Sequence, residues 1–176
     1  MTEDITVRVL RPEEWQRYKD VRLTALRESP EAFVADYDVE VGYDDEMWRN
    51  RMPRSARLLA ESGGQAVGVA SVGDSEGDDG KVIAKLFGLW VAPALRGAGV
   101  AAALVRAGAR TAATQGHTQL GYWVGSGNGR AVAFAVSFGF RPTDLRRPLR
   151  MPDGHSEEEV LLVMPLSSDG GELTTT

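Results

Sequence analysis

Hydrophobic and polar residues alternate with different periods along the chain, and the period predicts where strands and helices lie. Apolar residues at every second position indicate a strand, whereas apolar residues three or four positions apart indicate a helix. In the first third of the chain the pattern predicts a strand, a helix, a turn or short helix and a second long helix, over residues 5–10, 12–28, 30–37 and 44–52. The helix after residue 12 is expected to bury one stripe of large side chains, which begins with Trp15 and Tyr18.

A change to period two at Arg57 predicts a β-hairpin. Two apolar segments flank Gly63 and Gly64, and a pair of glycines between strands favours a tight hairpin turn. The acidic, glycine-rich segment 73–80 then predicts a solvated loop. The elements expected after it are a strand over 81–91, a helix over 99–115, a strand over 119–124, a helix from Asn128 to Gly139, a short strand from Phe140 that Pro142 limits, and a last strand over 157–164.

Length and composition predict one domain over residues 1–166, followed by a disordered polar tail over 167–176. The chain has no cysteine, which excludes disulfides and thiolate metal sites. Its two histidines, His117 and His155, lie too far apart for the spacing of a zinc site, so no metal is expected. The first residues lack the apolar core of a signal peptide, and no apolar run reaches the length of about 20 residues that a membrane span needs. We therefore expect a cytoplasmic protein without a membrane partner.

Charge is distributed unevenly along the chain, although the net charge is only −5. All 25 acidic residues lie in 1–80 or 144–176, whereas the block 81–143 holds seven Lys or Arg residues and no acid. A basic block of this kind predicts a pocket for a polyanionic ligand, although a buried central sheet that simply carries few charges is the plainer alternative. Nucleic acid is not expected, because the acidic chain has no helix rich in Lys and Arg.

The segment 86–105 gives the sharpest chemical signal. An apolar strand stops before Pro93, Gly97 and Gly99 interrupt the turn, and an alanine-rich helix follows. Glycines let a ligand approach the backbone, and the first N–H groups of a helix have no partner within the helix, so this turn predicts an anion site. Arg96 adds a positive charge and a planar set of donors suited to phosphate oxygens.

The same glycines also fit the dinucleotide fingerprint G-x-G-x-x-[G/A] over 97–102. That fold needs an acidic residue about 20 positions later to hold the ribose hydroxyls. The chain has no Asp or Glu between this loop and Asp144. A nicotinamide-dependent oxidoreductase is therefore the third of three hypotheses.

Two motifs together resemble those of the GNAT family of N-acetyltransferases. Arg96-Gly-Ala-Gly99-Val-Ala101 is similar to the pyrophosphate motif of that family, Arg/Gln-x-x-Gly-x-Gly/Ala. Asn128 and Ala131, followed by Gly139-Phe140, are similar to its second motif. The resemblance implies an α/β fold of the α+β, GNAT-like kind. Its mixed, mostly antiparallel sheet would have about six or seven strands and about four flanking helices, with a splay between the fourth and fifth strands for the pantetheine arm of acetyl-CoA.

The resemblance also implies an activity and a set of cofactor contacts. The activity is transfer of the acetyl group of acetyl-CoA to a primary amine of a small molecule or peptide, by direct attack in a ternary complex. The implied coenzyme A contacts are Trp90, Val91, Arg96, Gly97, Ala98, Gly99, Val100, Ala101, Asn128, Ala131 and Phe134. The Val91 backbone N–H is the candidate for polarising the thioester carbonyl. A plain helix cap at Asn128 and plain core packing at Phe134 remain open.

The catalytic groups are less well defined, because the chain departs from the family pattern. Ala135 stands where many members have a tyrosine that protonates the departing thiolate, which leaves Tyr122, Ser126, Ser137 or water. Strand 81–91 holds no carboxylate, so a general base would come from water or from one of the flanking acids, Glu31, Asp36, Glu40, Asp78 and Asp79. Each of these acids could equally be a solvated surface residue. Among them Asp79 is the catalytic candidate.

The acceptor side is expected to include Glu31, Phe33, Asp36, Tyr122 and Trp123. Residues 1–80 hold 18 acidic and ten basic residues, which suggests a cationic acceptor. The protein is expected to be a monomer or a homodimer. The second hypothesis is a GNAT-like module that binds acyl-CoA as a sensor and has lost turnover, as the alanine at position 135 would allow.

Overall fold

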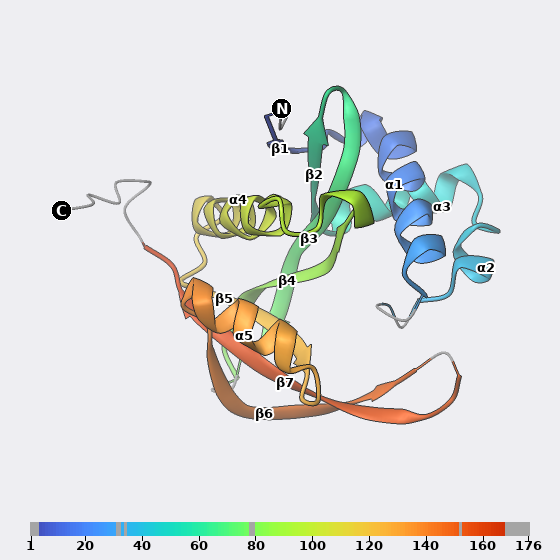
Figure 1. The fold of residues 1–176 in the computed structure, drawn as a ribbon. Helices are drawn as coiled ribbons and strands as arrows, with labels where there is room; N and C mark the ends of the chain where they lie inside the picture. Colours follow the sequence, from blue (N-terminus) through green and yellow to red (C-terminus); the bar gives the residue numbers. More distant parts are fainter. Residues whose placement is uncertain (1–3, 31–32, 34, 78–79, 152, 168–176) are drawn as a thin grey trace.

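A computed structural model describes residues 4–30, 33, 35–77, 80–151 and 153–167 (Figure 1). Their core is one seven-stranded sheet with the strand order β1-β2-β3-β4-β5-β7-β6. The strands are β1 (Thr6–Val9), β2 (Ala56–Ser62), β3 (Gln65–Glu76), β4 (Val82–Val91), β5 (Gln119–Gly125), β6 (Arg141–Arg150) and β7 (Ser156–Pro165). Neighbouring strands are antiparallel except β4 and β5, which are parallel. The predicted mixed, mostly antiparallel sheet is therefore confirmed.

Helices cover both faces of this sheet (Figure 1). In the described part of the chain the α-helices are α1 (Trp15–Glu28), α2 (Tyr37–Glu40), α3 (Asp45–Arg51), α4 (Val100–Thr114) and α5 (Gly129–Phe138). Short 3-10 turns lie at η1 (Pro12–Glu14), η3 (Met52–Arg54) and η4 (Pro93–Leu95). None of these helices is long and apolar enough to cross a membrane.

Strand alternation divides the core into two clusters, one on each face. Leu58 and Ala60 of β2 belong to the cluster beneath α4, whereas Leu59 between them belongs to the cluster beneath α1 and α3. This is the expected result of period-two side chains on a sheet that is buried on both faces. Gly108 lets α4 approach closely, since a Cβ at this position would lie 2.9 Å from Leu86 Cδ1.

Two boundaries predicted from the sequence are wrong. The segment 73–80 is not wholly a loop, because β3 continues to Glu76 and pairs with β4 as far as Val82. The backbone groups of this polar segment bond across the ladder while its side chains reach solvent, so acidic composition did not prevent a strand. β6 likewise continues past Pro142 to Arg150, because it is the edge strand of the sheet, where a missing proline N–H costs little.

The remaining predicted elements agree with the structure to within a few residues. The turn or short helix expected in 30–37 falls partly outside the described residues, and the short helix α2, which begins at Tyr37, was not predicted. The polar tail that was predicted to be disordered lies outside the described residues from position 168.

A bulge in β4 changes which face its side chains occupy. Val69 of β3 lies opposite Trp90 and Ser71 lies opposite Phe87, so two residues of β4, Gly88 and Leu89, face one residue of β3. Gly88 has φ +63°, a backbone conformation that favours glycine. Phe87 and Trp90 consequently point to the same face, toward α1, although they are three positions apart.

Pairing between β4 and β5 is short. It covers three residue pairs and ends at Leu86 and Tyr122, although β4 continues to Val91 and β5 to Gly125. A splay between the two strands beyond this point does not conflict with this register, and it stays a prediction.

Candidate functional site

The loop before α4 has the backbone conformation that the sequence predicts. Gly97 and Gly99 adopt φ of +86° and +90°, and a Cβ at either position would meet no atom within 4 Å. Gly99 is the N-cap of α4, and no side chain caps the helix there. The first intrahelical bond recorded at this end is donated by Ala103, so the N–H groups of residues 100–102 have no acceptor within the helix. These N–H groups and the positive end of the helix dipole form an open anion site.

Arg96 binds neighbouring protein groups in the structure. Its Nε donates to the Val91 carbonyl at 3.3 Å, and its Nη2 donates to Ser29 Oγ at 3.0 Å. Ser29 lies at the end of α1, so these bonds tie the loop to a helix on the other face of the sheet. Arg96 therefore positions the loop and brings its positive charge close to it.

Val91 presents its backbone polar groups away from β3. The Ala92 N–H donates to the Val67 carbonyl at 2.8 Å, while Val91 lies opposite Gly68. In an antiparallel ladder this pattern marks Val91 as part of a pair that is not hydrogen-bonded, whose N–H and C=O groups point to the other side of the strand. That side is the β5 side, where β5 no longer pairs with β4. The Trp90 backbone bonds to β3 instead, and its side chain is buried against α1.

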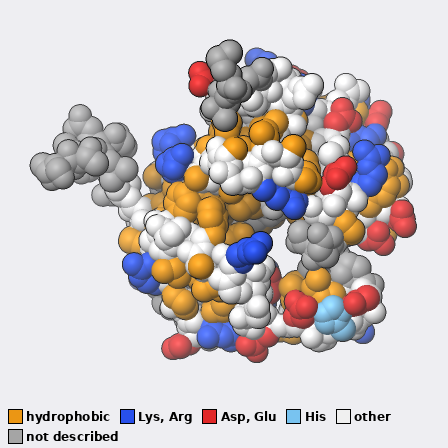
Figure 2. Space-filling view, viewed as in Figure 1, with side chains coloured by type: hydrophobic (Ala, Val, Ile, Leu, Met, Phe, Trp, Pro, Cys, Tyr) orange, Lys and Arg blue, Asp and Glu red, His pale blue; other side chains and the backbone are white. Residues whose placement is uncertain are grey.

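Helices α4 and α5 pack against the same core cluster, and hydrophobic side chains are visible on this face of the molecule (Figure 2). Asn128 caps α5, since its Oδ1 accepts from the Ala131 N–H at 3.1 Å, which confirms the cap. Phe134 and Ala131 are partly buried against the cluster beneath α4. Ser137 Oγ donates to the Phe134 carbonyl within its own helix. Ala135 is buried in the core, and its methyl side chain cannot donate a proton.

The two aromatic residues of β5 that were predicted to share the acceptor side lie on opposite faces of the sheet. Tyr122 packs on the α5 side, 6.0 Å from the Phe140 ring centre, whereas Trp123 faces the other way and stacks under Arg147 at 4.2 Å. Tyr122 is at the last residue pair between β4 and β5. Burial, and then the charge of Glu159, raise the pKa of Tyr122 above its ordinary value, so its phenol keeps its proton at neutral pH.

Of the five flanking acids named as candidate bases, the structure describes Asp36 and Glu40, and both are engaged by neighbouring groups. Asp36 caps α2 by accepting from the Asp38 N–H at 3.0 Å. Glu40 is buried and accepts from Arg22 Nε and Nη2 at 3.2 and 3.1 Å and from Arg51 Nη1 at 2.6 Å. Glu31, Asp78 and Asp79 lie outside the described residues. Phe33 is buried and stacks under the Arg22 guanidinium at 5.2 Å.

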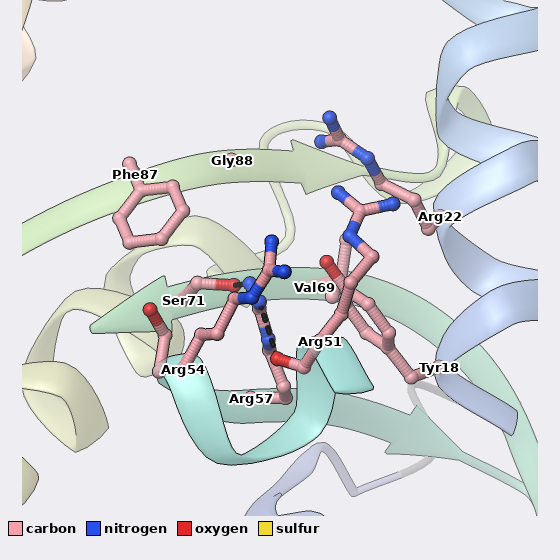
Figure 3. A pocket seen from close by; sticks show the side chains of 10 residues that line it. Tyr18, Arg22, Arg51, Arg54, Arg57, Val69, Ser71, Phe87 and Gly88 are labelled. Atoms are coloured by element: carbon pink, nitrogen blue, oxygen red, sulfur yellow. Dashed lines mark hydrogen bonds between the residues drawn. The ribbon is translucent and has the colours of Figure 1, made fainter. Parts of the chain in front are cut away.

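A cavity of about 230 Å³ lies on the α1 face of β4, and the sequence interpretation missed it (Figure 3). We call it the arginine pocket, because four arginines, one each from α1, α3, η3 and β2, line it. Its lining residues are Tyr18, Arg22, Arg51, Arg54, Ser55, Arg57, Val69, Ser71, Phe87 and Gly88. The available signal was the spacing Arg51-x-x-Arg54-x-x-Arg57.

Comparison with known proteins agrees with this architecture. Residues 11–140 match the family model described as Acetyltransferase (GNAT) family, whereas no curated protein shows significant sequence similarity to the chain. An acetyltransferase of the GNAT family from Streptococcus pneumoniae is 17% identical with a TM-score of 0.70, and the match covers 93% of this chain and 100% of that one. The ribosomal-protein-S18-alanine N-acetyltransferase from Escherichia coli is 20% identical with a TM-score of 0.65, over 98% of this chain and 100% of that one.

A third structure was determined with its cofactor acetyl-CoA. It is a protein from Salmonella typhimurium described as an acetyltransferase, 18% identical with a TM-score of 0.68, and the match covers 97% of this chain and 99% of that one. At these identities the three structures show a shared fold. The family model covers most of the residues from α1 to the start of β6, including both motifs that resemble the family, and the chain therefore belongs to the GNAT acetyltransferase family.

Proposed function

We propose that this protein transfers the acetyl group of acetyl-CoA to a primary amine by direct attack in a ternary complex. The observation that carries the proposal is the open anion site at the start of α4, which is joined by the short η4 turn to the end of β4 that no longer pairs with β5. One segment, 91–102, thus combines a site for phosphate groups with the Val91 N–H group, which does not donate to β3. Both features are needed to hold a long anionic thioester and to act on its carbonyl.

Coenzyme A fits the residues that are present. The space beside Gly97 and Gly99 is open, the block 81–143 has no carboxylate to repel phosphate, and the helix dipole favours negative charge there. Residues 97–101 would hold the pyrophosphate through their backbone, with Arg96 supplying charge beside them. Asn128 keeps its amide N–H₂ available while its oxygen caps α5, and Phe134 would pack beside the pantetheine.

When bound, acetyl-CoA supplies an activated acetyl group. The C–S bond of the thioester breaks as a C–N bond forms between the acetyl carbon and the amine. The Val91 N–H would stabilise the negative charge that develops on the acetyl oxygen. The Tyr122 hydroxyl would donate the proton that the departing thiolate takes up, and the phenol would regain a proton from water, which its raised pKa favours. The surplus proton of the amine passes to water, because no carboxylate of β4 is available to take it.

Titration calorimetry with acetyl-CoA and with NAD(P)H tests the donor. We expect acetyl-CoA to bind and the nicotinamides not to bind; absence of binding by any acyl-CoA at about 1 mM would rule the proposal out. Release of free thiol in the presence of a panel of amines then distinguishes an enzyme from a sensor. The sensor remains the second candidate because Ala135 is buried and cannot donate a proton.

The variant Tyr122→Phe tests the proton donor. Loss of the phenol hydroxyl should lower kcat by about 100-fold while the Kd for acetyl-CoA stays unchanged. Tyr43→Phe removes a phenol hydroxyl from a ring that stacks on Trp48, away from β5, and should have no effect on kcat. An unchanged kcat in Tyr122→Phe would assign the proton to water or to a serine, for which Ser137→Ala is the next variant.

A further inference from the structure

Four positive charges meet in the arginine pocket, and only one carboxylate balances them in the described part of the chain. Glu40 pairs with Arg22 and Arg51, whereas Arg54 and Arg57 form no ion pair among the described residues. Figure 3 shows the side chains of Arg22, Arg51 and Arg54 directed into the space beside Phe87 and Gly88. Arg54 also has no hydrogen bond to another described residue, although it reaches the same cavity.

Besides Glu40, neutral groups help to hold Arg51 and Arg57 in place. The Arg57 guanidinium donates to Ser71 Oγ and to the Arg51 carbonyl, both at 2.8 Å. The ring of Tyr18 contacts two of the arginines, with its centre 4.7 Å from Arg57 Cζ and 5.9 Å from Arg51 Cζ. Aromatic faces and carbonyl oxygens stabilise a guanidinium without cancelling its charge. The positive charge of the pocket is therefore still available to a ligand.

Arg57 is a buried cation that no described carboxylate neutralises. The residue is 5% exposed, and its buried Nε has no hydrogen-bond partner among the described residues. Burial lowers the pKa of Arg57, and the charges of Arg51, Arg22 and Arg54 lower it further, against an opposing effect of Tyr18. A bound carboxylate or phosphate would reverse these effects, because it would accept hydrogen bonds and offset like charges that now repel one another.

The pocket adjoins the part of β4 at which transfer is proposed. Phe87 and Gly88 line it, and both directly follow Leu86, the last residue of β4 that pairs with β5. The bulge at Gly88 turns Phe87 and Trp90 to the pocket side and leaves the Val91 N–H directed to the β5 side. A molecule anchored in the pocket would thus approach the strand that carries the oxyanion contact from the face opposite α4.

We infer that the arginine pocket binds the anionic group of the acceptor, so that the acceptor is a small amine that also carries a carboxylate or a phosphate. This inference rests on the proposed acetyl transfer and specifies its second substrate. A cavity of about 230 Å³ is large enough for such a group and the few atoms that join it to an amine. This acceptor carries an anionic group, whereas the acidic flanks of the sequence suggest a cationic acceptor.

Matched pairs of amines test the inference. L-Amino acids are compared with their carboxamides, and O-phosphoethanolamine is compared with ethanolamine, so that each pair differs in one anionic group. Thiol release with acetyl-CoA should give a kcat/KM at least about 10-fold higher for the charged member of the preferred pair. The amino acid and phosphate arms show which anionic group is used. In parallel, the charged member alone should raise the melting temperature more than its neutral partner does, and this measurement does not depend on turnover.

Arg54→Gln removes the arginine that has no ion pair or hydrogen bond to lose among the described residues. We expect KM for the charged amine to rise about 10- to 100-fold with little change in kcat, and the melting-temperature shift to disappear. Arg110→Gln is the control, because it removes one exposed charge from α4 on the other face of the sheet. Acetyl-CoA affinity should be unchanged in both variants.

The outcomes separate this inference from the proposed function. If acetyl-CoA binds but neutral or cationic amines react as well as the charged ones, or if no charged amine shifts the melting temperature, the inference is wrong and acetyl transfer stands. If acetyl-CoA does not bind, the proposed function fails, and a melting-temperature shift that Arg54→Gln abolishes would still identify an anion site.

Discussion

The two ends of the proposed reaction site are built in different ways. The donor end, apart from the proposed contacts of α5, lies within one continuous segment, 91–102, and uses mainly backbone groups and glycines, which have no side chains. The acceptor end uses side chains from α1, α3, the η3 turn, β2, β3 and β4, which meet only after folding. The donor end is open before any ligand arrives, whereas the acceptor end holds like charges together by means of one buried carboxylate, Glu40.

This difference separates two tasks that the molecule must perform. A pyrophosphate can be held by N–H groups whose positions follow from the start of any helix, so a short motif suffices. An acceptor must be recognised by the particular charges around it, and these can come from any element that faces the pocket. Changes at the donor end should therefore abolish binding and leave the fold intact, while changes at the acceptor end should affect stability and specificity together.

The largest expected effect is at the donor end, in the variant Gly99→Glu. A Cβ at this position would meet no atom within 4 Å, which indicates open space, so the fold should tolerate the substitution apart from a strain of about 1–2 kcal/mol at φ +90°. The added carboxylate would occupy the anion site and repel phosphate. We expect no measurable binding of acetyl-CoA by calorimetry, with a cooperative thermal transition retained.

Two alanine variants isolate the effect of charge at this position. Gly99→Ala introduces the same backbone strain without the carboxylate, and Gly116→Ala introduces it at the other end of α4, where φ is +88° and the space is also open. Both should lose similar stability, and Gly116→Ala should keep full affinity. If Gly99→Glu retains its affinity for acetyl-CoA, the pyrophosphate does not bind at this loop.

The next largest effect is expected at the acceptor end, in Glu40→Gln. The amide leaves Arg22 and Arg51 buried without their countercharge, and breaking a buried ion pair in this way costs about 3–5 kcal/mol. Chemical denaturation measures the loss. Glu158→Gln is the matched control, because its pair with Arg146 is exposed and 3.7 Å long and should contribute about 0–1 kcal/mol. A loss below 1 kcal/mol in Glu40→Gln would mean that the arginines do not depend on Glu40.

The Glu40 carboxylate should also make the free energy of unfolding depend on pH. Burial alone raises the pKa of Glu40, but the hydrogen bonds and charges of Arg22 and Arg51 outweigh burial and hold its pKa below the ordinary value. Its contribution to stability is therefore fully present above the unfolded pKa of about 4.3 and is lost as the pH falls through the lower folded pKa. The difference in free energy of unfolding between the wild-type protein and Glu40→Gln should thus shrink in acid. A difference that stays constant from neutral pH to about pH 3 in chemical denaturation would contradict this assignment.

The sequence was sufficient for most of the fold and for the donor end, for a physical reason in each case. Periodicity located the strands and long helices because both faces of the sheet are buried, and the donor motif was recognisable because its residues are adjacent in sequence. The arginine pocket was not found, since Arg22 and Ser71 are brought together only by the pairing of strands and the packing of α1. The length of β6 was also missed, because whether a strand lies at an edge is decided by the sheet and not by Pro142 itself.

Gly88 lines the arginine pocket and also lies in the bulge that directs the Val91 N–H, so it contributes to the acceptor end and the donor end. Gly88→Ala should have an intermediate effect on stability and on kcat/KM. A Cβ would lie 3.6 Å from Arg22 Nη1, an ordinary contact, so the cost is the strain at φ +63°, about 1–2 kcal/mol. If the bulge relaxes to remove that strain, Phe87 and the Val91 N–H shift together and kcat/KM falls. Gly64→Ala in the β2–β3 turn has φ +79° and open space, so it should lose similar stability with no change in kcat/KM. Equal activity in both variants would separate the bulge from the reaction.

The smallest expected effect is at Asn128, whose two roles can be separated. Asn128→Ala removes the cap of α5, in which Oδ1 accepts from the Ala131 N–H, and should cost about 1 kcal/mol of stability. Asn128→Ser keeps a capping oxygen and removes the amide N–H₂ that is proposed to bind the cofactor. If that contact exists, the serine variant should recover most of the stability in denaturation while its Kd for acetyl-CoA rises about 10-fold, as in the alanine variant. If affinity recovers together with stability, Asn128 acts only as the cap, and the donor end is made of the segment 91–102 without a contribution from α5.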